Sequence, residues 1–135
     1  MKVVVIDGQS GRMGQLFIEK AAAAKLPCEL LAVGTNAIAT AAMLKAGASA
    51  GATGENPVVV VCRTADIIVG PIGILVADAM LGEITEKMAL AVGRSAARKL
   101  LLPVNQCGNL IAGTQSMSLS RVMEEAVAML KDMLA

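Results

Sequence analysis

The feature that most constrains this chain is its opening, where a short apolar run leads through a glycine-rich turn into a helix-forming segment. The run Val3-Val4-Val5-Ile6 is followed by Asp7 and then by Gly8-Gln9-Ser10-Gly11-Arg12-Met13-Gly14. A β-branched run without helical period predicts a buried strand over residues 2–7. Glycines let backbone amides approach a phosphate, and the following helix contributes its positive dipole end. The opening therefore predicts a site for a nucleotide diphosphate.

The composition favours one domain whose sheet is covered on both sides. The 135 residues are 56% hydrophobic and 17% charged, which excludes disorder and leaves no room for separate cofactor and substrate domains. We therefore expect residues 1–135 to form a single domain. Part of the apolar surplus is expected to cover the interface of a homodimer or a higher homo-oligomer.

The charges and the aromatic content argue against nucleic acid as a partner. The net charge is +1, and Phe17 is the only aromatic residue, so both a basic footprint and stacking platforms for bases are missing. The apolar stretch 67–77 is shorter than the roughly 20 residues that span a membrane, and the opening run is too short for a signal peptide. We therefore expect no membrane partner and a cytoplasmic location.

Cysteine usage gives no sign of a metal centre. Cys28, Cys62 and Cys107 are widely separated, and the chain contains no histidine. The pattern therefore argues against a zinc site and against a disulfide framework.

Strand and helix signals alternate along the whole chain. Strands are predicted at residues 2–7, 29–34, 66–70 and 99–105, with a short one at 109–113. Helices are predicted at residues 12–25, 37–46, 74–81 and 85–97, with a short one over 58–61 after the capping pair Asn56-Pro57 and a last one capped by Ser118 or Ser120; residues 48–54 are predicted to be a loop. The last helix is expected to bury a stripe formed by Val122, Ala126, Met129, Leu130 and Met133. This order predicts an α/β fold: a single-domain, Rossmann-like, doubly wound and mainly parallel sheet with helices on both faces.

Ligands of such sheets bind beyond the carboxyl ends of the strands, and the loops at those ends supply the candidate site. The candidate cofactor-binding residues are Gly8, Gln9, Ser10, Gly11, Arg12, Met13, Gly14, Thr35, Asn36, Gly70 and Pro71. Gly8 and Gly11 would let the backbone pass beneath a diphosphate, and Gly14 would let the helix pack on the strand. The Ser10 hydroxyl would donate to a phosphate oxygen. Arg12 has two open roles, a phosphate contact or a solvated side chain.

The end of the second strand determines which cofactor is expected. In NAD-binding folds an acid about 20 residues past the glycines accepts hydrogen bonds from the ribose. Neutral Thr35 and Asn36 occupy that place, which makes NADP at least as compatible as NAD. Asn36 is also a natural N-cap for the next helix, and this is the favoured interpretation.

The sequence contains no recognisable catalytic set. Without histidine or tyrosine, acid–base work would fall to Asp, Glu, Lys or Cys. Cys107 follows a predicted strand, but nothing activates it, so an inert thiol is favoured. The other polar positions in apolar surroundings are Gly54-Glu55-Asn56, Asp78, Glu83 and Asn105-Gln106. Catalytic residues stay unassigned, and the sequence does not decide whether the chain is an enzyme.

The turn Gly8-Gln9-Ser10-Gly11-Arg12-Met13-Gly14 resembles the G-x-x-G-R-M-G opening of dihydrodipicolinate reductases, which are NAD(P)H-dependent enzymes with a Rossmann domain. The resemblance covers only the first strand–helix–strand unit, and the catalytic segment of that family has no counterpart here. It implies phosphate cradling by Gly8, Gly11 and Gly14, with Arg12 beside the cofactor.

A second resemblance extends over nearly the whole chain. The segments that carry it are Ile6-Asp7-Gly8-Gln9, Leu31-Ala32-Val33-Gly34-Thr35-Asn36-Ala37, Gly51-Ala52-Thr53-Gly54-Glu55-Asn56, Val69-Gly70-Pro71-Ile72-Gly73-Ile74 and Leu81-Gly82-Glu83-Ile84-Thr85. In these segments the chain is similar to an uncharacterised bacterial family, domain of unknown function 3842, with a Rossmann-like fold. The resemblance implies the fold and confers no activity.

Three functions fit the sequence. The leading hypothesis is a protein that binds a nucleotide or dinucleotide of the NAD(P) type through residues 8–14, as a redox or nucleotide sensor. The first alternative is a small NADP-dependent reductase with a site at a homodimer interface, to which the partner subunit supplies polar groups such as Glu83 or Asn105. The second alternative is a scaffold that retains the fold without a ligand.

Overall fold

Five parallel strands form the centre of the computed structural model, which describes residues 1–104, 108–114 and 116–135. The strands are β1 (Lys2–Asp7), β2 (Glu29–Gly34), β3 (Ala50–Thr53), β4 (Ile67–Pro71) and β5 (Arg98–Leu102). The helices are α1 (Arg12–Ala23), α2 (Ala37–Ala46), α3 (Glu55–Cys62), α4 (Glu86–Arg94) and α5 (Leu119–Leu134), with a short 3-10 helix, η1 (Ile72–Leu75). The predicted α/β, Rossmann-like fold is confirmed.

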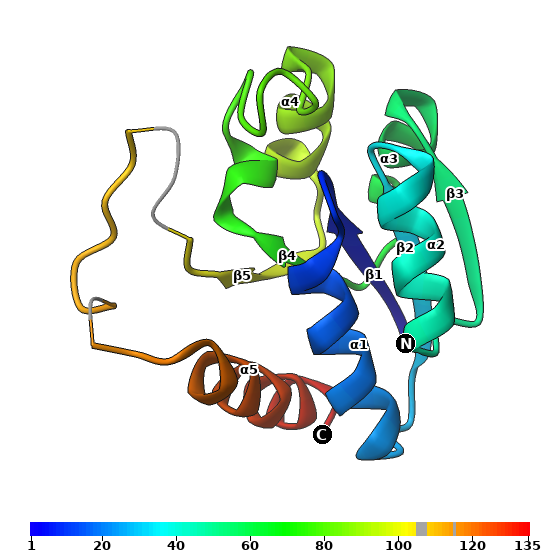
Figure 1. Ribbon diagram of the computed structural model, residues 1–135. Coiled ribbons are helices and arrows are strands. Elements are labelled where there is room, and N and C mark those ends of the chain that lie inside the picture. Colours follow the sequence, from blue (N-terminus) through cyan, green and yellow to red (C-terminus); the bar gives the residue numbers. More distant parts are fainter. Residues whose placement is uncertain (105–107, 115) are drawn as a thin grey trace.

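Helices cover the sheet on both faces (Figure 1). Alternate side chains of β1 point to opposite faces, so Val3 and Val5 lie in one core and Val4 and Ile6 in the other. Helices α1, α2 and α5 bury their apolar sides in the first core, whereas α3, α4 and η1 bury theirs in the second. A strand buried on both faces needs a continuous apolar run, which explains the opening of the sequence.

The strand order β3-β2-β1-β4-β5 places the direction change of the chain at the middle of the sheet. The chain winds from β1 outward to β3, and then returns to the other side of β1 to form β4 and β5. Ligands of doubly wound sheets bind in the crevice beyond the carboxyl ends of the strands at this switch point. Here the crevice lies beyond the ends of β1 and β4, at Asp7 and Pro71.

The prediction of a loop over residues 48–54 is wrong, because residues 50–53 form the edge strand β3. All four residues of β3 are exposed, and they pair in register with β2, as in Leu31 with Ala50 and Gly34 with Thr53. Alanine and glycine have little strand preference, so the pairing depends on backbone hydrogen bonds to β2 rather than on side-chain burial.

The short helix before β4 is confirmed, but its cap is not where the sequence placed it. Helix α3 begins at Glu55 after Gly54, so Asn56 lies inside the first turn instead of capping it.

The helix predicted over residues 74–81 is also wrong. Only the 3-10 turn η1 forms there, because Asp78, Met80 and Leu81 adopt positive φ angles of 67°, 58° and 56°, followed by Gly82 at 92°. A right-handed helix cannot include such residues. The segment between η1 and α4 (residues 76–85) is instead closed by hydrogen bonds from the Asp78 amide to the Ile84 carbonyl and from the Ile84 amide to the Ala79 carbonyl.

The C-terminal third differs from the prediction in its details. Strand β5 ends at Leu102, residues 109–113 form no strand, and Asn105 lies outside the described residues. Ser118 caps α5, as predicted, by accepting a hydrogen bond from the Arg121 amide. Met129 was expected in the buried stripe but is 48% exposed, and Met123 is buried instead.

Gly11 is required where α1 packs against α2, and its substitution tests this packing. Its φ is +74°, and a Cβ there would lie 2.7 Å from the Ala39 Cα. We expect Gly11→Ala to lower the free energy of unfolding by about 2 kcal/mol or more, because backbone strain and overpacking add. Urea unfolding measures the change.

Gly108→Ala is the matched control, because Gly108 has a similar φ of +77° and no described residue has an atom within 4 Å of the added Cβ. Its free energy of unfolding should fall by about 1–2 kcal/mol, from backbone strain alone. Equal losses in the two variants would show that contact with α2 does not matter.

Candidate functional site

Asp7 ends β1 beneath the glycine loop (residues 8–14) and organises it. The side chain is only 4% exposed. Its Oδ1 accepts the Gly8 amide and its Oδ2 accepts the Gly14 amide, each at 2.8 Å. Burial raises the pKa of Asp7, the amide bonds oppose this, and the nearby Glu83 charge raises the pKa further. The carboxylate thus fills the position at the start of α1 where an external anion would bind in many nucleotide sites.

The three motif glycines lie against protein. A Cβ on Gly11 would meet Ala39 of α2, and one on Gly14 would meet Met43 of α2 and the Asp7 Cβ. A Cβ on Gly8 would meet the Thr35 hydroxyl and the Met80 sulfur. The glycines therefore permit close packing with α2, with the end of β2 and with segment 76–85.

Most amides of the glycine loop are already paired. The Gly11 amide donates to the Gly8 carbonyl at 2.8 Å, and the Gln9 amide donates to Glu83 Oε1 at 2.9 Å. The Met13 amide also contributes to the stabilisation of ionised Asp7. Within the described part of the chain, the Ser10 and Arg12 amides have no acceptor, and both residues are exposed.

Glu83 comes from segment 76–85 and joins the end of β2 to the glycine loop. Its Oε1 accepts three hydrogen bonds, from the Thr35 hydroxyl at 2.6 Å, the Asn36 side-chain amide at 2.7 Å and the Gln9 backbone amide. Partial burial raises the pKa of Glu83, but the three hydrogen bonds outweigh it, so the pKa lies below its ordinary value. The carboxylate is therefore ionised at neutral pH.

Asn36 has two roles. Its Oδ1 accepts the Ala39 amide at 2.9 Å, which confirms the predicted cap of α2. Its Nδ2 donates to Glu83 and to the Gln9 carbonyl, the latter at 2.9 Å. The Asn36 side chain therefore both caps α2 and holds the Glu83 carboxylate.

A cleft of about 250 Å³ lies at the switch point of the sheet. It is lined by Asp7, Gly8, Gln9, Ser10, Arg12, Met13, Pro71, Met80 and Val104. Gly70 lies inside the sheet, where a Cβ would meet the Ile6 carbonyl. Of the candidate residues at the ends of β2 and β4, only Pro71 lines the cleft. Asn36, next to Thr35, lies beside the cleft because its side-chain amide donates to the carbonyl of the cleft residue Gln9.

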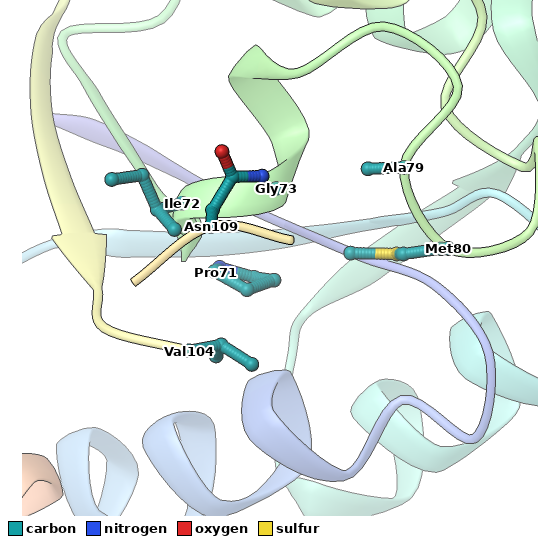
Figure 2. A pocket seen from close by; sticks show the side chains of 7 residues that line it. All are labelled: Pro71, Ile72, Gly73, Ala79, Met80, Val104 and Asn109. Carbon is teal, nitrogen blue, oxygen red and sulfur yellow. The ribbon is translucent and has the colours of Figure 1, made fainter. Parts of the chain in front are cut away.

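A smaller cavity of about 20 Å³ adjoins the cleft through the shared residues Pro71, Met80 and Val104. Figure 2 shows its lining, in which Val104 and Asn109 follow β5, and Ala79 and Met80 belong to segment 76–85. A cavity of this size has room for about one water molecule. The shared residues Pro71, Met80 and Val104 form an apolar part of the cleft lining.

Two acidic residues, Asp7 and Glu83, are central to the arrangement, and only one of them is marked by a local sequence pattern. Asp7 is a charged residue at the end of a continuous buried run, and this position is itself a sign of a buried acceptor. Glu83 lies 48 residues beyond Thr35, and no local pattern predicts that the two meet.

The remaining candidates add no reactive group. Burial raises the pKa of the Cys28 and Cys62 thiols, which makes both unreactive; Cys107 lies outside the described residues. Among residues 1–104, 108–114 and 116–135, no group of three or more His, Cys, Asp and Glu side chains could hold a metal ion. In the same ranges, no helix has the length and apolar character needed to cross a membrane.

The contacts of Asp7 predict the effect of removing its charge. In Asp7→Asn one oxygen remains to accept an amide, and the new NH₂ group faces a second donor. We expect the free energy of unfolding at neutral pH to fall by about 1–3 kcal/mol, the cost of an unpaired buried donor. Asp66→Asn is the control, because the exposed Asp66 accepts a single hydrogen bond from the Lys2 amide, which asparagine can also accept.

The pH dependence of this difference is a further readout. Since the folded pKa of Asp7 is raised above 3.8, the folded state binds the proton more tightly than the unfolded state. The stability of the wild type relative to Asp7→Asn should therefore decrease as the pH rises from about 3.8 through the folded pKa. A difference that does not change with pH would contradict the burial of this carboxylate.

Comparisons with known proteins identify a family and a distant structural neighbour. No curated protein matches the chain. The crystal structure of a dodecameric FMN-dependent Ubix-like decarboxylase from Escherichia coli O157:H7 is similar over 98% of this chain and 94% of that chain, with 14% identity and a TM-score of 0.45. A likeness this distant carries no argument about cofactor or assembly. A family described as Domain of unknown function (DUF3842) matches residues 2–135, and the protein therefore belongs to this family.

Proposed function

We propose that the protein binds a nucleotide of the NAD(P) type through its phosphates, in the cleft beyond the carboxyl ends of β1 and β4. One observation carries the proposal: the cleft at the switch point is lined by Ser10 and Arg12, whose amides have no acceptor within the described residues. Exposed amides at the start of a helix attract anions. The side chains of these two cleft-lining residues, a hydroxyl and a guanidinium, are further donors for a phosphate.

The binding mode differs from the one implied by the glycine pattern. Because Asp7 and Glu83 already accept loop amides, a phosphate binds at the outer side of the loop, at Ser10 and Arg12, rather than beneath Gly8 and Gly11. The positive charge of Arg12 offsets the repulsion between a phosphate and these two carboxylates. The cleft is also smaller than the roughly 300–1,000 Å³ of typical ligand pockets. The rest of the nucleotide therefore extends along the loop toward the end of β2.

Binding or sensing is better supported than catalysis. Opposite the loop the cleft is lined by Pro71, Met80 and Val104, which supply no acid or base. The alternative of a reductase relied on polar groups of a partner subunit, such as Glu83 or Asn105; Glu83 is instead held beside the glycine loop of its own chain by three donors, and Asn105 lies outside the described residues. Assembly into a homodimer or a higher homo-oligomer, and a cytoplasmic location, stay predictions.

A thermal-shift titration of the purified protein tests the proposal. The panel contains NAD, NADP, their reduced forms, ATP, AMP, FAD, FMN and coenzyme A. A ligand at 100 times its dissociation constant stabilises the folded state by about 2.7 kcal/mol, which raises the melting temperature by several degrees. Stabilisation by pyridine nucleotides supports the proposal, and stabilisation by another compound alone changes the ligand class. No response to any compound would favour a scaffold.

Arg12→Gln tests the position of the phosphate. Because the side chain is exposed, the stability should not change, whereas the affinity for the bound nucleotide should fall about tenfold or more through the loss of a charge-assisted hydrogen bond. Isothermal titration calorimetry measures the affinity of the wild type and of Arg12→Gln for the nucleotide.

Arg121→Gln is the matched control, because Arg121 is an exposed arginine near the start of another helix, α5. It removes the same charge from a residue that does not line the cleft. If the two variants bind equally well, the phosphate does not lie beside Arg12.

A further inference from the structure

The end of β2 lies beside the glycine loop, at the place where NAD-binding folds hold the ribose. Thr35 and Asn36 directly follow β2, and the Thr35 amide donates to the Asp7 carbonyl at 3.0 Å. In such folds an acid about 20 residues beyond the glycines accepts the ribose hydroxyls. Neither Thr35 nor Asn36 is acidic, yet the structure brings a carboxylate to this end of β2 from Glu83.

The two oxygens of Glu83 are unequally used. Oε1 accepts all three hydrogen bonds, from Gln9, Thr35 and Asn36. Within the described residues Oε2 has no partner, and the side chain is only partly buried. The carboxylate is thus fixed through one oxygen and presents the other as an acceptor beside the loop.

Segment 76–85 fixes the position of this carboxylate. Met80 is 7% exposed and lines the cleft, while three consecutive residues, Met80, Leu81 and Gly82, have positive φ angles. Leu81 is 96% exposed, so its left-handed conformation is not explained by burial of its own side chain. The backbone turns here and directs Glu83 toward β2.

Among the described residues, no lysine or arginine forms an ion pair with Glu83. The groups that donate hydrogen bonds to Glu83 are neutral, and the nearby charged group, Asp7, is also acidic. A ribose hydroxyl donates to a carboxylate, whereas a 2′-phosphate brings at least one further negative charge without a lysine or arginine to receive it. The site therefore distinguishes a free ribose from a 2′-phosphorylated one.

We propose that Glu83 selects nucleotides with a free ribose 2′,3′-diol and rejects 2′-phosphorylated ones, so that the ligand is NAD rather than NADP. This inference rests on the proposed nucleotide function. It reverses the expectation drawn from neutral Thr35 and Asn36, because the acid that the second strand lacks is supplied by a distant segment. Glu83 is thus a specificity-determining residue whose free oxygen accepts the ribose hydroxyls.

Glu83→Gln tests the inference with little change of shape, because glutamine has the same size and keeps one oxygen as an acceptor for the donors of Gln9, Thr35 and Asn36. Affinities for NAD⁺ and NADP⁺ are measured by isothermal titration calorimetry for the wild type and the variant. Glu86→Gln is the matched control, since Glu86 is exposed in the first turn of α4 and loses the same charge without touching the loop. Circular dichroism and the melting temperature establish that both variants are folded.

We expect the wild type and Glu86→Gln to bind NAD⁺ about tenfold or more tightly than NADP⁺. In Glu83→Gln, NAD⁺ binding should weaken, and the preference should fall to within about threefold, because an amide can donate to a 2′-phosphate. Equal wild-type affinities, an unchanged preference in Glu83→Gln, or tighter NAD⁺ binding by that variant would each overturn the role of Glu83 and leave the proposed function intact. If neither nucleotide binds to any variant, the proposed function fails and this inference fails with it.

Discussion

The hydrogen bonds of the Asp7 carboxylate are the interaction on which the rest of the site depends. The side chain is almost fully buried, and burial of an unpaired charge would be very costly. Two backbone amides, those of Gly8 and Gly14, satisfy its two oxygens, and charge-assisted bonds of this kind are stronger than neutral ones. They connect the end of β1 to the first turn of α1 and so set the path of the glycine loop.

This internal anion changes what the loop can bind. The start of α1 carries a positive partial charge, and Asp7 already neutralises part of it from beneath. A phosphate can approach only the amides that remain, at Ser10 and Arg12, and Arg12 supplies the cation that such an approach needs. The motif glycines serve packing against α2 and segment 76–85, so the glycine pattern alone says less about binding than the unpaired amides do.

The outcome of the sequence predictions follows from how local each signal is. The strand–turn–helix opening and the Asn36 cap of α2 were predictable because their determinants lie within a few residues. Strand β3 was not, since its alanines and glycine form a strand only by pairing with β2. The left-handed Met80 and Leu81 were not predictable either, because neither residue type prefers that conformation.

The candidate site likewise has some features with local determinants and others that depend on residues distant in sequence. Its loop was predictable from the glycines, whereas its electrostatics depend on Glu83, which reaches Thr35 only in the folded chain. For the proposed nucleotide ligand, the two carboxylates under and beside the loop restrict binding: the phosphate is expected at Arg12, and a hydroxyl rather than a second anion is expected at Glu83. In the proposed function, nucleotide specificity is therefore a property of the tertiary structure, set by the segment that carries Glu83 to the end of β2 and not by the residues that end that strand.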